Sequence, residues 1–236
     1  MKMIGFIPCR AGSERAKNKN TRPFAGFEHG LLELKLCQLH EVEGLERIIV
    51  SSNDPAVLDY AAHVAKNIDS RVEPMPRPEE WGNSATSMGD FIRKYIAYLS
   101  DEGDIFWTHV THPFVTADIY GRALLAYRTA RNEGYDSFVS ATRIQKFLWK
   151  DGKPFNYDNS IERWPRSQDI EPVFEINHAI YAMPFKYMRE FGDRVGQNPY
   201  FFEMNEAEAM DIDWEDQFIM LDEIAKARIS MGLSLI

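Results

Sequence analysis

The chain has 236 residues, 44% of them hydrophobic, so it can bury a sizeable core within one α/β domain spanning residues 1–236. Its formal net charge of −9 argues against general nucleic-acid binding, and no apolar run reaches the ~18 residues that cross a membrane. The first residues show no signal-peptide pattern, and two cysteines are too few for a disulfide framework. We therefore expect a cytoplasmic protein that binds neither nucleic acid nor membrane.

Strand and helix patterns alternate through the first part of the chain. Short runs rich in Ile, Val or Phe, bounded by Asp, Gly, Pro or Asn, predict strands at 3–8, 46–51, 71–75, 104–110 and 136–142. Helical periodicity between them predicts helices at about 31–43, 55–66, 86–99 and 116–133. This alternation is typical of parallel strands joined by right-handed crossovers, with helices on both faces of the sheet.

The alternation fails between Lys146 and Asn177. The region has interleaved charges and no Gly/Ser-rich linker, and it contains Trp149, Phe155, Tyr157, Trp164, Pro165, Pro172 and Phe174. We interpret it as an insertion folded onto the main sheet. For any one of its aromatic residues, a place in the ordinary core is an equal alternative.

A glycine-containing, cation-rich loop follows the first predicted strand. Its cations are Arg10, Arg15, Lys17 and Lys19. Backbone N–H groups of Ala11, Gly12 and Ser13 can surround phosphate oxygens, because glycine has no Cβ to block a close approach. The P-loop pattern and the dinucleotide-binding glycine pattern are both absent. The loop indicates a site for a nucleotide triphosphate, although its charge alone fits a solvated basic turn equally well.

Five motifs, taken in order, resemble the signature of the cytidylyltransferases that activate acidic sugars. They are Ile7-Pro-Cys-Arg-Ala-Gly-Ser13 with Lys19-Asn20 and Arg22-Pro23, Ser51-Ser-Asn-Asp-Pro55, Arg77-Pro-Glu-Glu-Trp81, Asn177-His-Ala-Ile-Tyr181 and Met210-Asp-Ile-Asp213. The family comprises the CMP-sialic acid synthetases (acylneuraminate cytidylyltransferases) and relatives such as the CMP-Kdo synthetases. The series spans about residues 4 to 220, and its order is far more specific than any single motif.

The resemblance implies a fold, a reaction and an assembly. The fold is a Rossmann-like three-layer α/β sandwich (a GT-A-like nucleotidyltransferase fold) with a mostly parallel sheet. Its insertion, about residues 146–177, serves dimerisation and sugar binding in a homodimer. The reaction joins CTP to an acidic 2-keto-3-deoxy sugar, giving a CMP-sugar and pyrophosphate. Since the sugar hydroxyl attacks the α-phosphorus directly, the protein's main work is alignment and charge neutralisation.

Asp211 and Asp213 are the metal ligands that the resemblance implies. On an extended segment two residues apart, both carboxylates point the same way and offer the hard oxygen ligands that Mg²⁺ prefers. For a lone D-x-D, a solvated pair of carboxylates is the alternative. The match to the family motif favours Mg²⁺ as the cofactor.

The remaining site residues are also implied by the resemblance. With the two aspartates, Arg10 and Lys19 form the catalytic set, since they hold the β- and γ-phosphates. The CTP-binding set is Ala11, Gly12, Ser13, Asn20, Arg77 and Ser87. For Arg77, a surface salt bridge is the alternative. The sugar-binding set is His109, Thr111, Arg166, Gln168, Asn177 and Tyr181, with Arg166 facing the sugar carboxylate.

Three histidines depart from the family pattern. His109 stands where the family has glutamine, His112 where it has serine, and His178 where it has glycine. These changes indicate an altered acceptor, since histidine donates or accepts hydrogen bonds differently. Three alternatives therefore remain: a sugar-phosphate or polyol-phosphate acceptor, a nucleotide-binding module that has lost turnover, and a His-x-x-His metal site at 109–112.

Overall fold

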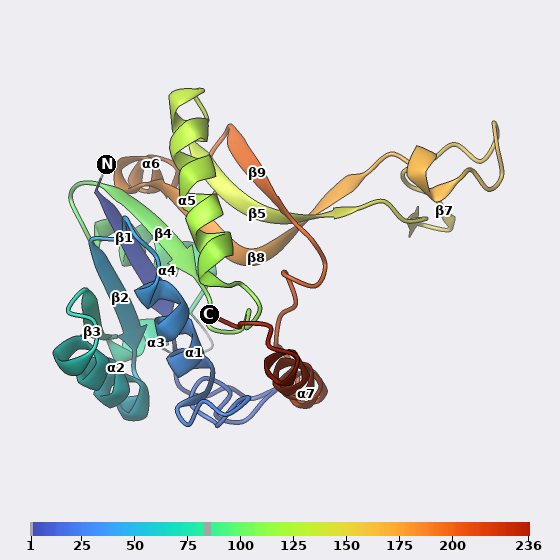
Figure 1. The fold of residues 1–236 in the computed structure, drawn as a ribbon. Coiled ribbons are helices and arrows are strands. Elements are labelled where there is room, and N and C mark those ends of the chain that lie inside the picture. The colour runs from blue at the N-terminus through green and yellow to red at the C-terminus, as the bar shows by residue number, and fades with distance from the viewer. Residues whose placement is uncertain (1, 83–85) are drawn as a thin grey trace.

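The computed structural model describes residues 2–82 and 86–236. Its centre is a seven-stranded sheet in the order β3-β2-β1-β4-β8-β5-β9 (Figure 1). The strands are β1 (Met3–Pro8), β2 (Arg47–Ser52), β3 (Val72–Pro76), β4 (Asp104–Thr108), β5 (Ser137–Ile144), β8 (Val173–Pro184) and β9 (Pro199–Met204). Strand β8 runs antiparallel to β4 and β5, and every other pair in this sheet is parallel. The expected mostly parallel sheet is confirmed.

Helices cover both faces of the sheet. They are α1 (Gly30–His40), α2 (Pro55–Asn67), α3 (Glu79–Gly82), α4 (Met88–Lys94), α5 (Ala117–Asn132), α6 (Phe185–Phe191) and α7 (Glu215–Ser230), with 3₁₀ turns η1 (Ile96–Tyr98) and η2 (Ser167–Asp169). Within the described ranges, no helix is both long and apolar enough to span a bilayer.

Two hydrophobic cores lie on opposite faces of the sheet, because successive side chains of a strand point to opposite sides. On β1, Ile4 and Phe6 pack in the core under α4 and α6, whereas Met3 and Ile7 pack in the core under α1, α2 and α5. All four side chains are fully buried. The three-layer α/β arrangement expected from the sequence is therefore confirmed.

The predicted elements of the first part of the chain match the structure closely. Strands β1 to β5 begin within one residue of their predicted starts, and α5 buries the apolar face formed by Ile119, Ala123, Leu124 and Tyr127. The helix expected at 86–99 is divided into α4 and η1, because Tyr95 between them leaves the helical region with φ of −126°. Strand β8 was not predicted, since Asn177 and His178 interrupt its apolar run.

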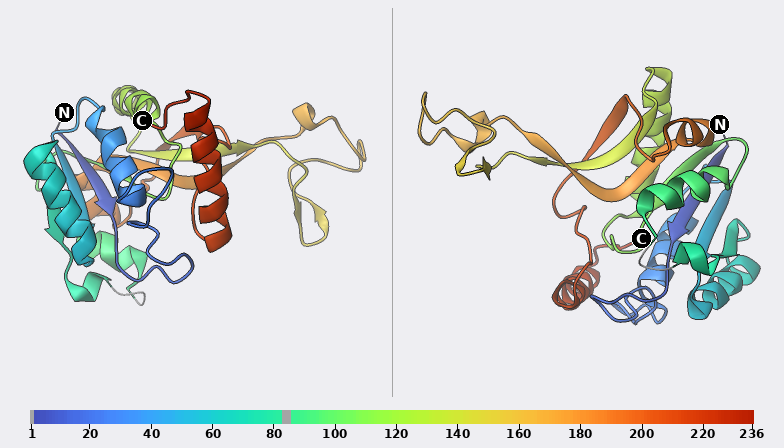
Figure 2. Two further views of the ribbon diagram at one scale, coloured as in Figure 1. Left: turned by 60° about the horizontal axis from the view of Figure 1, so that its bottom comes forward. Right: turned by 180° about the vertical axis from the view of Figure 1, so that it is seen from behind.

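The region between β5 and β8 forms an arm that projects from the body of the protein (Figures 1 and 2). It contains a two-stranded sheet of β6 (Trp149–Lys150) and β7 (Lys153–Pro154). The expectation that this insertion folds onto the main sheet is wrong. Its rings pack on one another instead, with Phe147 centred 5.2 Å from Tyr157 and 5.5 Å from Trp164.

Candidate active site

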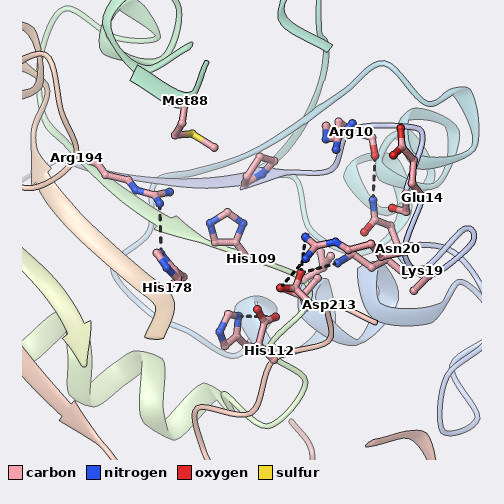
Figure 3. A pocket seen from close by; sticks show the side chains of 17 residues that line it. Arg10, Glu14, Lys19, Asn20, Met88, His109, His112, His178, Arg194 and Asp213 are labelled. Carbon is pink, nitrogen blue, oxygen red and sulfur yellow. Dashed lines mark hydrogen bonds and ion pairs between the residues drawn. The ribbon is translucent and has the colours of Figure 1, made fainter. Parts of the chain in front are cut away.

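A cavity of about 520 Å³ lies at the carboxyl ends of β1 and β4 (Figure 3). Ligands bind at this edge of open α/β sheets, because the loops leaving parallel strands converge there. Six segments line the cavity: the loop after β1, the start of α4, the turn after β4, strand β8, the loop after α6 and the segment before α7. Their polar side chains include Arg10, Ser13, Glu14, Arg15, Lys19, Asn20, His109, Thr111, His112, His178, Arg194, Asp211 and Asp213.

The cationic loop and the aspartate pair meet in this cavity, although nearly 200 residues separate them in sequence. Arg15 Nη2 lies 3.1 Å from Asp213 Oδ1, and Lys19 Nζ lies 3.7 Å from the same oxygen. Lys19 Nζ also donates a 2.7 Å hydrogen bond to the carbonyl oxygen of Ile212. Burial lowers the pKa of Lys19, against the attraction of Asp213 and Asp211. A merely solvated basic turn does not describe Lys19, whose side chain is only 16% exposed.

The loop after β1 is braced from two sides. Ala11 N–H donates to Asn53 Oδ1 at 2.8 Å, so in this structure it anchors the loop and, contrary to the expectation from the sequence, is not available to a phosphate oxygen. Asn20 Nδ2 donates to the carbonyl oxygen of Arg10 at 3.3 Å. Gly12 has a φ of +76°, in the left-handed region that favours glycine, and no atom lies within 4 Å of where its Cβ would be. Glycine is therefore favoured here by backbone conformation and leaves open space beside the loop.

Asp211 and Asp213 flank Ile212, which is fully buried in the core. Ile212 N–H donates to the carbonyl oxygen of Thr111 at 3.0 Å, and this bond holds the aspartate segment against the turn after β4. The alternation expected for an extended D-x-D segment is present, with the apolar residue turned inward. Asp213 is ion-paired and Asp211 Oδ1 is buried, which disfavours the alternative of a simply solvated pair, although the two side chains are 42% and 35% exposed.

The aspartate pair fits a magnesium ion. Asp211 Oδ1 has no hydrogen-bond partner in the described structure, and a buried carboxylate oxygen without a partner is costly. No group of three or more His, Cys, Asp or Glu residues in the described ranges is arranged to hold a metal. Two carboxylates are nevertheless sufficient for Mg²⁺, which takes its remaining ligands from water and substrate phosphates.

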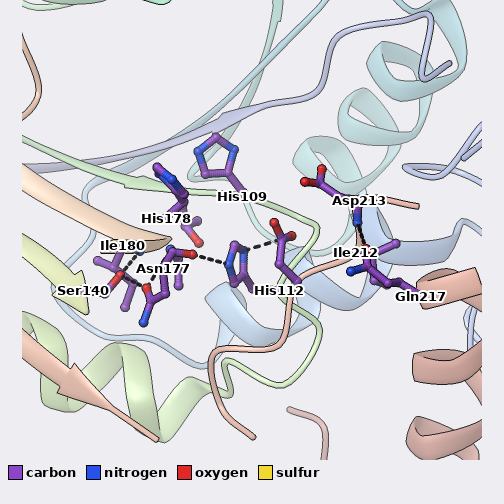
Figure 4. A network of polar contacts seen from close by, with 12 residues as sticks. His109, His112, Ser140, Asn177, His178, Ile180, Ile212, Asp213 and Gln217 are labelled. Carbon is purple, nitrogen blue, oxygen red and sulfur yellow. Dashed lines mark hydrogen bonds and ion pairs between the residues drawn. The ribbon is translucent and has the colours of Figure 1, made fainter. Parts of the chain in front are cut away.

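His112 connects the aspartate pair to β8 (Figure 4). Its Nε2 donates to the carbonyl oxygen of Asn177 at 2.8 Å, which leaves Nδ1 facing Asp211 Oδ1 at 3.7 Å. That distance is too long for a hydrogen bond, and His112 Nδ1 has no partner among the described residues. Burial lowers the pKa of His112, although the nearby Asp211 carboxylate opposes this effect.

His109 and His178 line the cavity away from the aspartates. Trp107 Nε1 donates to His109 Nε2 at 3.0 Å, so the His109 proton sits on Nδ1. Burial lowers the pKa of His109 well below 6.5, which keeps this imidazole neutral at neutral pH. His178 Nδ1 lies 2.5 Å from the hydroxyl of Tyr181, and the backbone of His178 has a φ of +64°. Glycine adopts this left-handed backbone conformation without strain, so the glycine that the resembling family has at this position fits the same backbone.

A second cavity of about 310 Å³ adjoins the first and shares Pro8, Arg10, Met88 and His109 with it. Its other walls are mainly aromatic: Trp81, Phe91 and Trp107, together with Arg77 and Thr86. Flat apolar walls with a few polar groups suit a nucleobase.

Arg77 and Ser87 occupy different positions relative to this second cavity. Arg77 is only 7% exposed, and its Nη2 donates to the carbonyl oxygen of Ser51 at 2.9 Å. The surface salt-bridge alternative for Arg77 is therefore wrong. Ser87 lies outside the lining, where its hydroxyl accepts the Asp90 N–H at 3.1 Å and caps α4.

Four residues expected to bind the sugar do not line the main cavity. The amide of Asn177 is engaged inside the sheet, where Oδ1 accepts from Ser140 Oγ at 2.6 Å and Nδ2 donates to Thr142 Oγ1 at 3.1 Å. Tyr181 is 2% exposed and lies behind His178. Arg166 and Gln168 lie on the arm, and Arg166 Nε pairs with Asp169 at 2.7 Å. Conversely, Arg194 lines the cavity although no motif marked it.

The sheet order and the site define an α/β fold of the nucleotidyltransferase type. The structure is similar to a CMP:2-keto-3-deoxy-manno-octonic acid synthetase complexed with CTP, with a TM-score of 0.68, 14% identity and coverage of 99% of this chain and 100% of that one. It is also similar to 4-diphosphocytidyl-2C-methyl-D-erythritol synthase from Anaerococcus prevotii, with a TM-score of 0.65, 12% identity and coverage of 97% and 98%.

Two curated relatives show which kind of nucleotidyltransferase the chain resembles. The chain is 26% identical over 204 residues to CMP-N,N'-diacetyllegionaminic acid synthase of Legionella pneumophila, which covers 80% of this chain and 81% of that protein. It is 28% identical over 145 residues to N-acylneuraminate cytidylyltransferase of Escherichia coli O18:K1:H7, covering 61% of this chain and 32% of that protein. No protein-family model matches the chain. The resemblance to acidic-sugar cytidylyltransferases is thus confirmed.

Proposed function

We propose that this protein is a cytidylyltransferase that joins CTP to an acidic 2-keto-3-deoxy sugar, giving a CMP-sugar and pyrophosphate with Mg²⁺ as cofactor. The observation that carries the proposal is the meeting of Arg15 and Lys19 with Asp213 inside one cavity. A triphosphate needs the cations, and its metal counterion needs the carboxylates. The curated relatives, which are named for acidic sugars, support the same substrate class.

The cations and the carboxylates of the cavity have different roles in the proposed reaction. Arg10, Arg15 and Lys19 are within the cavity and can turn to phosphate oxygens when a triphosphate enters. Their charge stabilises the pyrophosphate as it departs. Asp211 and Asp213 would hold Mg²⁺, which when bound supplies charge neutralisation between phosphate oxygens. No covalent enzyme intermediate is needed, because an acceptor hydroxyl attacks the α-phosphorus in line with the leaving group.

The second cavity supports a nucleoside position next to the phosphate loop. Arg77 is fixed against Phe91, with its guanidinium carbon 4.7 Å from the ring centre, so it borders that cavity in a defined orientation. Arg10 and His109 line both cavities, which supports a ribose bound beside these two residues. The CTP-bound synthetase of similar fold is consistent with cytidine as the nucleoside.

Pyrophosphate release tests the proposal. Purified protein is mixed with CTP, Mg²⁺ and a panel of acidic keto sugars, and a second panel contains sugar phosphates and polyol phosphates. We expect release with at least one acid, and its loss in Asp211→Ala. Asp216→Asn, an exposed carboxylate on α7, is the matched control and should remain active.

Two experimental results would assign a different function to the protein. Release only with phosphorylated acceptors would assign the alternative acceptor class. Binding of CTP by calorimetry, without release for any acceptor, would indicate a nucleotide-binding module that has lost turnover. The presence of both aspartates and of Arg10 and Lys19 in one cavity favours an active enzyme.

We also propose a homodimer in which the arm contributes to the contact. The arm exposes large apolar side chains, with Trp149 at 54%, Ile161 at 85% and Trp164 at 61% exposure. Exposed apolar groups gathered in one segment are typical of interaction surfaces. Light scattering with size-exclusion chromatography measures the assembly. A monomer at micromolar concentration would contradict the proposal.

Both cysteines are free thiols, which agrees with a cytoplasmic location.

A further inference from the structure

Arg194 brings a positive charge to the end of the cavity that faces away from the phosphate loop. It follows α6, and Figure 3 shows it with His178 on one side of the cavity, while Arg10, Lys19 and Asp213 lie on the other. Its Nη1 is buried and has no hydrogen-bond partner within the described residues. An arginine N–H group in this condition is expected to have an external acceptor.

Aromatic rings, rather than carboxylates, hold the Arg194 guanidinium. Its central carbon lies 4.0 Å from the ring centre of Tyr181 and 4.9 Å from that of Trp107. Nη2 lies 3.4 Å from His178 Nδ1. The neighbouring carboxylate of Asp193 instead accepts the backbone N–H of Arg194 at 2.6 Å. None of the ion pairs found in residues 2–82 and 86–236 includes Arg194.

The loop that carries Arg194 is fixed to the start of β5. Gly196 N–H donates to Ser137 Oγ at 2.8 Å. Asp136 Oδ2 accepts the backbone N–H groups of Gln197 at 2.7 Å and Asn198 at 2.9 Å. These bonds make the loop a defined support. Arg194 is therefore presented in one orientation, as a substrate-binding group requires.

The imidazoles near Arg194 leave its charge uncompensated. His109 and His178 both have pKa values lowered first by burial and then by Arg194 itself, so both are neutral at neutral pH. Of the cavity's carboxylates, Glu14 and Asp213 lie on the side of the cationic loop (Figure 3). Asp211 faces His112. Burial lowers the pKa of Arg194, and the nearby Tyr181 and Asp193 only partly oppose this effect. Because its guanidinium forms no ion pair within the described residues, an anionic substrate group would relieve the cost of burying this cation.

We propose that Arg194 binds the carboxylate of the acidic acceptor, on the same chain that supplies the aspartate pair. This inference rests on the proposed function. The planar guanidinium fork matches a carboxylate, and stacking on Tyr181 and Trp107 fixes its plane. The triphosphate and the acceptor's own anion are thereby bound at opposite ends of one cavity. Arg166, which the sequence suggested for the carboxylate, is 73% exposed on the arm and paired with Asp169.

Two substitutions of Arg194 distinguish the effect of its positive charge from the effect of its guanidinium geometry. Arg194→Met retains the apolar stem but removes the charge, and Arg194→Lys retains the charge but loses the fork. We expect Arg194→Met to raise the KM for the acid about 10- to 100-fold, as for loss of a charge-assisted pair, with the KM for CTP changed less than about 2-fold. Arg194→Lys should fall between Arg194→Met and the native protein.

Lys186→Met is the matched control, since Lys186 is an exposed cation stacked 4.6 Å from the ring centre of Tyr187. It should leave both KM values unchanged. Thermal unfolding midpoints and CTP calorimetry show that each variant is folded. An unchanged acceptor KM in Arg194→Met, or an equal rise in both KM values, would overturn the assignment.

A binding measurement decides the inference independently of turnover. With CTP and a chelator present, calorimetry compares N-acetylneuraminate, legionaminic acid and 2-keto-3-deoxy-octonate with their methyl esters. We expect at least one acid to bind more tightly than its ester, and this preference to vanish in Arg194→Met. If no acid is preferred, or if Arg194→Met weakens only phosphorylated acceptors, the carboxylate assignment is wrong. Failure of pyrophosphate release, with the acid preference intact, would reject only the proposed function.

Discussion

Replacing His178 by glycine and by alanine tests whether its backbone is strained. The φ of +64° at His178 is a conformation that costs a residue with a Cβ about 1–2 kcal/mol. Both substitutions remove the imidazole and its 2.5 Å contact with the Tyr181 hydroxyl, a loss of about 0.5–1.5 kcal/mol. Only glycine relieves the backbone strain, although its freer unfolded chain returns about 0.4–1 kcal/mol of that gain.

The difference between the two variants isolates the backbone term. We expect His178→Gly to be more stable than His178→Ala by about 1 kcal/mol, which reverses the usual order of the two residues. For a chain of 236 residues that difference corresponds to about 2–4 °C in the unfolding midpoint. Calorimetric melting and urea unfolding, followed by tryptophan fluorescence, both measure it. An alanine variant at least as stable as the glycine variant would refute the reasoning.

Two further predictions concern buried basic groups. Burial lowers the pKa of His109 well below 6.5, so below pH 6.5 this imidazole becomes protonated in the unfolded chain but stays neutral in the folded protein. Because the unfolded state then binds more protons, the free energy of unfolding falls as the pH drops. His109→Gln should make that fall shallower, by at most about 1.4 kcal/mol per pH unit, and equal slopes in unfolding measured from pH 7 to 5 would count against it. Lys35→Met removes the hydrogen bonds from Lys35 Nζ to the His112 carbonyl oxygen (3.1 Å) and to the Tyr120 hydroxyl (2.6 Å), which should cost about 1–3 kcal/mol of unfolding free energy. Urea unfolding beside the exposed-site control Lys66→Met checks this, and unchanged stability would argue against a supporting role for Lys35.

Local patterns predicted the half of the fold in which each strand is followed by its own helix. Strands β1, β2 and β4 are short apolar runs with clear polar ends, and α5 repeats its apolar residues at helical spacing. The cationic loop and the His109–His112 turn follow the parallel strands β1 and β4, so both lie at one edge of the sheet. That placement required only the general rule for parallel strands.

Long-range packing determined what the sequence did not predict. Arg194 reaches the cavity because its loop is bonded to Asp136 and Ser137, and a single arginine in a polar loop carries no local mark of such a position. The buried Arg77, in the loop after β3, packs against Phe91 of helix α4, a contact that no local pattern indicates. Within the projecting arm β6 and β7 pair with each other rather than with the main sheet, which composition alone does not indicate.

Arg15 and Lys19 pair with Asp213 inside the cavity, so these two cations already have a carboxylate of the protein as counterion. An anion that enters without a metal ion must compete with the Asp213 carboxylate for these cations. Once bound, it lies close to that carboxylate, and the two negative charges repel each other. Small anions abundant in cells, such as inorganic phosphate, therefore gain little from the cluster. A nucleotide accompanied by a divalent cation satisfies both sets of charges together. We therefore expect the internal ion pairs to favour binding of a metal-nucleotide complex over binding of bare phosphate.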